Sequence, residues 1–509
     1  MRRAVWAVLS ACSVMAAACT GVDVTPTGSP VASSRPSASP RTGGPQLTPC
    51  PYRGDLVCGS IDVPLDRAHP DDATISIAFS VHPHTDESGP ADEPIVSLPG
   101  GPGSGANGVM EFMLAMNPVL AHHDIVAISP RGTGASGPID CPDLQNGWRT
   151  TAELDDAVRA CGERLGDDAD RYGSGDVALD VEAVRRALGY DRIDLYAFSY
   201  GVVPEQAYAV RFPQHVHALV FDAGMAVTDP PHTWAWGLGI PRAMVREVAL
   251  MCARSHRCRV REPAEVVRWL VHRAASRPIR GRLRVPGGEP QRVEVDEPEV
   301  ANLLRSVGTC VVCGQIDPAE LLHAGVALRR GDLQPLLRIA YVHGLGPPDV
   351  APDPADFSVG DNFAALCNDE DFVWDRTDPV PVRRDAYENA VAAFPPRTFA
   401  PFSLRGWMAF RQPAGCLGWP APDRFEPAVP AGAAFPDVPT LILAGDGDTV
   451  VPPEVVETLR RELPGATYVT VAGAGHPVAG PAWGPCGAEL VGQMFDSLEI
   501  IDSSCAKAP

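Results

Sequence analysis

The chain has 509 residues, 45% of them hydrophobic, which is enough for two or three domains or for one large catalytic domain with an insertion. Acidic side chains outnumber basic ones 63 to 42, giving a formal net charge of -21 at pH 7 without any basic cluster. Such a surface repels the phosphates of a nucleic acid, so nucleic acid is excluded as an expected partner.

The first residues have the composition of an export signal. Two arginines precede a mostly apolar run from Ala4 to Ala18, which is shorter than the roughly 20 residues of a membrane-spanning helix. Small residues before Cys19 resemble a bacterial lipobox, although Ala16 stands where leucine is usual. Cys19 is then the expected lipidated first residue of a cell-envelope lipoprotein; ordinary cleavage nearby, giving a freely secreted protein, is the alternative. Residues 20–47 are rich in Ser, Thr, Pro and Gly and are expected to form a disordered tether.

Twelve of the 14 cysteines follow the signal segment, which contains Cys12 and ends at Cys19. An even number of cysteines behind an export signal indicates disulfides, because the exported compartment is oxidising. The twelve are Cys50, Cys58, Cys141, Cys161, Cys252, Cys258, Cys310, Cys313, Cys367, Cys416, Cys486 and Cys505. Sequence neighbours suggest the pairs Cys50 with Cys58, Cys141 with Cys161, Cys252 with Cys258, and Cys486 with Cys505.

The remaining close pair, Cys310 and Cys313, has the CxxC spacing of a redox or zinc motif. Zinc needs two further ligands at matching spacing, and the chain has no second CxxC. A structural disulfide is therefore expected there, and no metal site is predicted.

Short apolar segments alternate with longer amphipathic ones along much of the chain. The expected strands are residues 73–81, 93–100, 124–132, 191–199, 217–224, 438–448 and 466–473. Several are near-continuous apolar runs, as strands buried on both faces of a parallel sheet are. Helical spacing is seen at 176–190 and 452–463. This alternation predicts an α/β fold with a mostly parallel sheet and helices on both faces.

The alternation is interrupted between Gly224 and Val438. The clearer helical patterns there are residues 264–276, 318–330 and 385–394, and a polar stretch at 281–299 can form a hairpin. We expect a large, mainly helical cap inserted before the last part of the sheet. The predicted parts are a signal peptide at 1–19, a tether at 20–47, the first part of the α/β core at 48–225, a cap at 226–432 and the rest of the core at 433–509.

The stretch LYAFSYG, residues 195–201, has the strand–turn–helix context of a nucleophile elbow. The usual pattern is G-x-S-x-G, and Ala197 replaces its first glycine. Because a serine hydroxyl is a weak nucleophile until a base removes its proton, Ser199 needs partners elsewhere. The glycine-rich stretch LPGGPGSG at 98–105 follows a strand and can turn an amide outward. The predicted oxyanion-hole donors are the amides of Gly101 and Tyr200.

Two loops after the expected cap supply an acid and a base. Asp448 follows a strand in LAGDGDTVVP, with Asp446 as its competitor, and His476 lies in GAGHPV. The order Ser, Asp, His, each at the end of an expected strand, is that of α/β-hydrolases. The sequence therefore predicts a serine hydrolase in which Ser199, His476 and Asp448 are nucleophile, base and acid. This chemistry implies no metal or organic cofactor.

Several motifs together resemble the proline iminopeptidase and tripeptidyl aminopeptidase group of α/β-hydrolases. They are PGGPG (99–103), PRGTGAS (130–136), SYG (199–201), FDAG (221–224), GDGDTVVP (445–452) and GAGH (473–476). CGSIDVPLDRAHP (58–70) and the cysteine-bearing C-terminal part are similar to the exported actinobacterial branch of this group. The chain departs from the group at Ser129, where aspartate is usual, and at Ala197, which leaves the substrate preference open.

The resemblance implies an exported serine peptidase that removes N-terminal residues or short peptides through an acyl-enzyme. Such an enzyme must recognise a free α-ammonium, for which Glu205, Asp369 and Glu370 are the candidates. An esterase or amidase of the same fold, acting on non-peptide substrates, and a cell-envelope scaffold without turnover remain as alternatives. The expected partners are a peptide or a small ester or amide substrate, with membrane contact only through a lipid at Cys19.

Overall fold

The computed structural model describes residues 44–86, 91–116, 121–148, 150–227, 236–285, 288–309, 315–344, 351–424 and 426–507. The predictions for the signal segment, for Cys19, for most of the tether and for the pair Cys310 and Cys313 lie outside these residues. No helix within the described ranges is both long and apolar enough to cross a bilayer.

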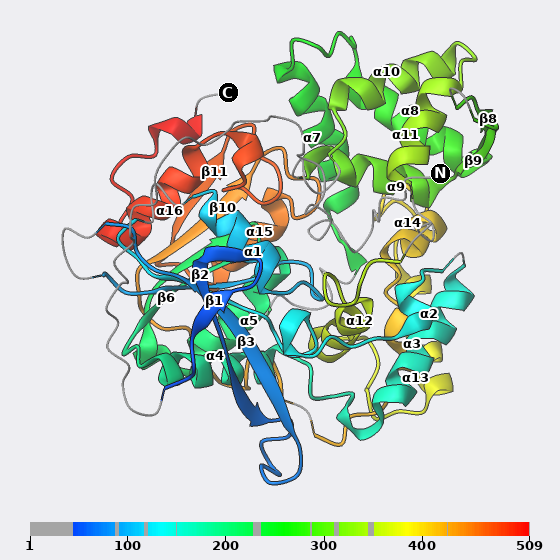
Figure 1. Cartoon of the computed structure of the whole chain (residues 1–509). Helices are drawn as coiled ribbons and strands as arrows, with labels where there is room; N and C mark the ends of the chain where they lie inside the picture. The colour runs from blue at the N-terminus through cyan, green and yellow to red at the C-terminus, as the bar shows by residue number, and fades with distance from the viewer. Residues whose placement is uncertain are drawn as a thin grey trace.

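Nine strands form one sheet in the order β1-β2-β3-β5-β4-β6-β7-β10-β11 (Figure 1). The strands are β1 (Thr48–Cys50), β2 (Arg53–Pro64), β3 (Thr74–His82), β4 (Ile95–Leu98), β5 (Ile125–Ile128), β6 (Ile193–Phe198), β7 (Val216–Asp222), β10 (Thr440–Gly445) and β11 (Thr467–Val471). Pairing is parallel from β5 through β11 and antiparallel among β1, β2, β3 and β5. The predicted α/β fold and all seven expected strands are confirmed.

Helices cover both faces of the sheet. Along β6, Leu195 and Ala197 face one apolar cluster, whereas Tyr196 and Phe198 face another. The first cluster is closed by α4 (Ser174–Leu188), α5 (Val202–Arg211) and α15 (Pro453–Glu462), and the second by α1 (Ala106–Leu114) and α16 (Cys486–Ser497). This double cover explains why the parallel strands are continuous apolar runs in the sequence.

The chain between β7 and β10 holds most of the remaining helices (Figure 1). They are α7 (Ile240–Arg254), α8 (Pro263–Ser276), α9 (Glu297–Arg305), α10 (Pro318–Arg329), α11 (Gln334–His343), α12 (Val359–Asp369), α13 (Val380–Ala393) and α14 (Leu404–Arg411). The expected hairpin is the antiparallel pair β8 (Ile279–Leu283) and β9 (Gln291–Val295). We call this interval the insertion.

Two helices from an earlier part of the chain join the insertion. Figure 1 shows α2 (Pro142–Gln145) and α3 (Thr151–Leu165) beside α12 and α13. Leu154 and Val158 of α3 share an apolar cluster with Phe363 of α12 and Leu417. The helical part of the molecule beside the sheet domain is therefore built from two separate stretches of chain.

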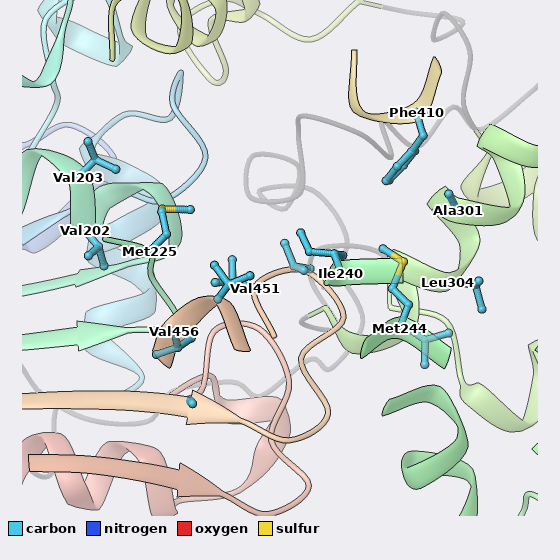
Figure 2. Close-up of a cluster of buried hydrophobic side chains, with 14 of the residues drawn as sticks. Val202, Val203, Met225, Ile240, Met244, Ala301, Leu304, Phe410, Val451 and Val456 are labelled. Carbon is cyan, nitrogen blue, oxygen red and sulfur yellow. The ribbon is translucent and has the colours of Figure 1, made fainter. Parts of the chain in front are cut away.

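The insertion packs directly on the sheet domain. One cluster of buried side chains includes Val202 and Val203 from the sheet domain together with Ile240, Met244 and Phe410 from the insertion. Figure 2 shows these residues, with Val451 and Val456 beside them. Because burial of apolar area stabilises by about 25 cal/mol per Å², this shared cluster holds the insertion firmly against the core.

Five disulfides lie within the described ranges. Four are the pairs expected from sequence proximity: Cys50–Cys58, Cys141–Cys161, Cys252–Cys258 and Cys486–Cys505. The fifth, Cys367–Cys416, links α12 to the turn Gly415–Gly418 across 49 residues. The sequence named both of its cysteines but offered no partner for either.

Candidate active site

Ser199 lies where β6 ends, in the short turn Ser199–Gly201 that leads into α5. Its φ is 57°, in the left-handed region that is rare for a residue other than glycine. The turn is also crowded, since a Cβ on Gly201 would lie 2.7 Å from the carbonyl oxygens of Leu98 and Pro99. Strand, strained turn and helix together form the geometry of a nucleophile elbow.

The departure at Ala197 falls inside the strand and not in the turn. Ala197 is completely buried in β6, where it pairs with Leu98 of β4 and Phe221 of β7. Its methyl group belongs to the apolar cluster below α4 and α5. The extra methyl is therefore packed in the core, and the elbow forms without a glycine there.

The glycine-rich loop after β4 faces the same pocket as the elbow. Gly101 has φ 52°, which favours glycine, and it lines the pocket together with Ser199 and Tyr200. The second departure, Ser129, supports this loop from behind: its Oγ accepts the amide of Ala106, the first residue of α1, at 2.9 Å. Serine thus has a defined role where the group usually has aspartate.

Asp448 and His476 are in contact at the ends of β10 and β11. His476 Nδ1 lies 2.8 Å from Asp448 Oδ2, and the other carboxylate oxygen accepts the amides of Val450 and Val451 at 2.8 Å. Asp448 is fully buried and His476 is 9% exposed. A buried carboxylate with these partners can orient an imidazole whose Nδ1 carries the proton.

Asp446, the competing acid, has a different partner. Its carboxylate oxygens accept hydrogen bonds from the guanidinium of Arg254 on α7 at 2.5 and 2.7 Å. It also accepts the amide of Gly473 at 2.7 Å. Asp446 therefore ties the insertion to the loop before His476 and does not contact the imidazole.

Asp222 is a buried carboxylate that the sequence reasoning did not single out. It ends β7 and accepts the amides of Val478 and Ala479 at 2.7 and 2.9 Å and the hydroxyl of Tyr196 at 2.8 Å. Burial raises the pKa of Asp222 to about 6, although these three donors favour its charged form. The sequence feature that could have indicated Asp222 is its position in FDAG, at the end of an expected strand.

The pocket above Ser199 has a volume of about 160 Å³, and most of its lining comes from the insertion. The sheet domain contributes Gly101, Pro102, Ser199, Tyr200, Thr449 and Val450. The insertion contributes Ile240, Met244, Arg305, Asn362, Phe363, Leu366, Glu370, Phe410, Arg411, Gln412, Pro413, Gly415 and Cys416. A small, mainly apolar group can therefore occupy it beside a few charged side chains.

Of the three carboxylates proposed as ammonium ligands, Glu370 is the one that lines this pocket. Burial raises its pKa to about 7, while the nearby guanidinium of Arg411 favours the charged form. Glu205 is completely buried beside the backbone of Ala197 and Val220, and burial raises its pKa well above its ordinary value. It does not line the pocket.

Asp369 is directed to the sheet domain and not into the pocket. It accepts the amide and the hydroxyl of Ser174, at 2.8 and 2.6 Å, and the phenolic hydroxyl of Tyr200. Tyr200, the residue after Ser199, is thereby joined to the end of α12, and the neighbouring Glu370 is held at the pocket wall.

Within the described ranges, no three His, Cys, Asp or Glu side chains lie close enough together to hold a metal ion.

Comparison with known proteins agrees with this geometry. The family model described as alpha/beta hydrolase fold matches residues 93–259, and the model described as TAP-like protein matches residues 402–505. The serine protease Hip1 of Mycobacterium tuberculosis is 25% identical over 526 aligned residues, which cover 93% of this chain and 92% of that protein.

Two further relatives are similar over most of their length. Tripeptidyl aminopeptidase of Streptomyces coelicolor is 26% identical over 467 residues, covering 84% of this chain and 78% of that protein. Carboxylesterase B of Mycobacterium tuberculosis is 27% identical over 486 residues, covering 88% and 82%. The chain is therefore a serine hydrolase of the α/β-hydrolase fold with a TAP-like C-terminal segment, and a serine protease, a tripeptidyl aminopeptidase and a carboxylesterase are similar to it over most of its length.

Proposed function

We propose that this protein is an aminopeptidase that releases N-terminal residues or short peptides through an acyl-enzyme at Ser199. The observation that carries the proposal is one pocket lined both by Ser199 and by the carboxylate of Glu370. The first offers a nucleophile at a strained elbow, and the second offers a partner for a substrate's α-ammonium. The relatives named serine protease and tripeptidyl aminopeptidase agree with this assignment.

In the proposed mechanism His476 accepts the proton of Ser199 Oγ while Oγ attacks the carbonyl carbon of the scissile bond. Asp448 accepts the Nδ1–H of the imidazole and stabilises the imidazolium that forms. The amides of Gly101 and Tyr200 are the proposed donors to the oxyanion.

The tetrahedral intermediate then collapses. The C–N bond breaks, and the imidazolium gives its proton to the departing amine, which leaves an ester on Ser199. Water attacks this ester with His476 again as base, and the released acid is the N-terminal residue or peptide. Ser199 recovers its proton, so the cycle needs no co-reactant other than water.

Two features of Glu370 favour a cation beside it, and the guanidinium of Arg411, which also lines the pocket, is the group with which a substrate ammonium would compete. Glu370 follows directly on α12, whose carboxyl-terminal end carries the negative pole of the helix dipole. Glu370 is half-buried, so an ion pair with an ammonium is less screened than one on the surface.

An esterase or amidase acting on non-peptide substrates is the second candidate, and the similarity to a carboxylesterase favours keeping it. It would use the same nucleophile and base but would not need Glu370. The third candidate, an envelope scaffold without turnover, would leave Ser199 unreactive.

The experiment that separates the first two candidates is a panel of chromogenic aminoacyl and tripeptidyl amides, each with a free and an acetylated N-terminus, beside simple esters. We expect acetylation to lower kcat/KM by at least about 100-fold, because a site built for a polar group strongly rejects an analogue that lacks it. Equal cleavage of acetylated substrates, or cleavage of esters alone, would favour the esterase.

We further propose that the protein is exported and held on the outer side of the cytoplasmic membrane by a lipid at Cys19. The signal-like start and the lipobox-like alanines support this proposal, as do the disulfides, which persist in oxidising compartments. Membrane fractionation of wild type and Cys19→Ala tests it. A wild-type protein found free in the culture medium would favour the secreted alternative.

A further inference from the structure

A backbone segment of the insertion is hydrogen-bonded to the loop that carries His476. This segment, Arg305–Thr309, begins at the last residue of α9, and its Gly308 carbonyl accepts the amide of His476 at 2.7 Å. Thr309 forms an isolated parallel bridge with His476. The backbone of His476 is therefore hydrogen-bonded to the insertion, although the loop belongs to the sheet domain.

The residue after Asp448 completes the connection. Thr449 is completely buried, and its Oγ1 accepts the amide of Gly308 at 2.9 Å and donates to the carbonyl of Arg305 at 2.7 Å. One hydroxyl thus uses both hydrogen-bonding roles on a single segment of the insertion. The loop that carries Asp448 and the loop that carries His476 are thus both hydrogen-bonded to Gly308, the first at its amide and the second at its carbonyl.

The fit between the three segments leaves no room for a side chain. A Cβ on Gly308 would lie 2.4 Å from the carbonyl oxygen of Gly447 and 2.5 Å from the amide nitrogen of Thr449. A Cβ on Gly475 would lie 2.4 Å from the carbonyl oxygen of Gly308. At this point the backbone of Gly308 alone separates the loop of Asp448 from the loop of His476.

We propose that Thr449 and Gly308 are positioning residues, and that the segment Arg305–Thr309 is a fixed spacer that sets the geometry of Asp448 against His476. The insertion is then part of the catalytic unit as well as the wall of the substrate pocket. This inference rests on the proposed function, because it takes Asp448 and His476 as the acid and the base. Misplacing a catalytic group by about 1 Å can cost 100-fold in rate, so a small loosening of the spacer has a measurable effect.

The test compares Thr449→Val, which keeps the volume and removes the hydroxyl, with Thr449→Ser, which keeps the hydroxyl. The matched control is Thr458→Val in α15. Thr458 is also a buried threonine whose Oγ1 accepts an amide, that of Ala226 at 3.2 Å, and donates to a carbonyl, that of Val455 at 2.6 Å. The measurements are the rate of labelling by a fluorophosphonate probe, kcat and KM on an amide from the substrate panel, and Tm.

We expect Thr449→Val to lower both kcat and the labelling rate by about 10- to 100-fold, as misalignment of a catalytic group predicts. Thr449→Ser should keep most of the wild-type rate, and Thr458→Val should lower Tm to a similar extent without loss of rate. Gly308→Ala, which pushes the segments apart, should lose rate in the same way and gives an independent arm if Thr449→Val does not fold.

The proposal is overturned if folded Thr449→Val or Gly308→Ala labels and turns over like Thr458→Val, because the contact would then only dock the insertion. A wild-type protein that the probe does not label at Ser199 would instead overturn the proposed function, and this inference with it. The two failures are thus distinguished by the wild-type reaction alone.

Discussion

Asp222 accepts a hydrogen bond from the amide of Val478, two residues beyond His476, at 2.7 Å. The strand next to the nucleophile strand therefore holds the histidine loop through a side chain. A carboxylate suits this place because three donors converge on it: two loop amides and the hydroxyl of Tyr196. An asparagine has one oxygen for the same donors.

Asp222→Asn should lower kcat by about 10-fold, because its amide NH₂ faces an N–H donor and leaves a buried group unpaired. We expect the same unpaired group to cost about 1 to 3 kcal/mol in the free energy of unfolding. Steady-state kinetics and urea unfolding of wild type and variant measure both effects. Unchanged kcat in the folded variant would show that the loop holds its position without this carboxylate.

The pH dependence of stability tests the same residue. Because burial raises the pKa of Asp222 to about 6 from 3.8, the folded protein keeps a proton that the unfolded chain loses between these values. The contribution of this group to stability therefore falls as pH rises from about 4 to 6, and it is constant above. Unfolding of wild type relative to Asp222→Asn at pH 4, 5, 6 and 7 should show this decline, and a difference that is flat across the range would contradict it.

Glu370→Gln should lower kcat/KM for substrates with a free N-terminus by about 10- to 100-fold, which is the loss expected when a half-buried charge partner is removed. Ester hydrolysis should be unchanged, since esters without an amine do not use this group. Asp371→Asn is the matched control, because Asp371 is the exposed neighbouring carboxylate and does not line the pocket. An equal effect of Glu370→Gln on amides and esters would rule out ammonium recognition.

The pKa of Glu370, about 7, adds a pH signature to this comparison. Below that value the carboxyl group is neutral and cannot pair with an ammonium, so wild-type KM for free-amine substrates should rise as pH falls through 7. The Gln variant should lack this rise, because its amide does not titrate.

Ala197→Gly restores the usual elbow pattern but should not raise activity, because the methyl group lies in the core and not in the turn. Removal of one buried methyl and the added freedom of glycine should together lower the free energy of unfolding by about 1 to 2 kcal/mol. Thermal unfolding and kcat of the variant check this. A large gain in kcat would mean that alanine strains the elbow.

The strands, and the positions of Ser199, Asp448 and His476 at strand ends, could be predicted because their signals are local. Seven strands follow from apolar runs, and Ser199, Asp448 and His476 follow from short motifs in a required order. Strands β1 and β2 were missed because they lie at the antiparallel edge of the sheet and β2 is only partly buried, so it has no apolar run.

Contacts that join distant stretches of chain left no such signal. The hydroxyl of Thr449 accepts the backbone amide of Gly308, and neither a threonine nor a backbone amide indicates in the sequence which group it will bond to. Cys367 and Cys416 are 49 residues apart, so the sequence proximity that suggested the other pairs gave no signal for this one. The sequence could not separate Glu370 from Glu205 either, because both are carboxylates near expected functional segments. The structure shows that Glu370 lines the pocket and that Glu205 does not.

Acylation of Ser199 is the step on which the proposed function depends, and covalent labelling reports on it without a choice of substrate. Wild type and Ser199→Ala are treated with a fluorophosphonate probe, and the modified peptide is located by mass spectrometry. We expect one adduct on the peptide that contains Ser199 in wild type, none in Ser199→Ala, and strongly slowed labelling in His476→Ala. Absence of an adduct in wild type, or equal labelling of Ser199→Ala, would show that Ser199 is not the nucleophile.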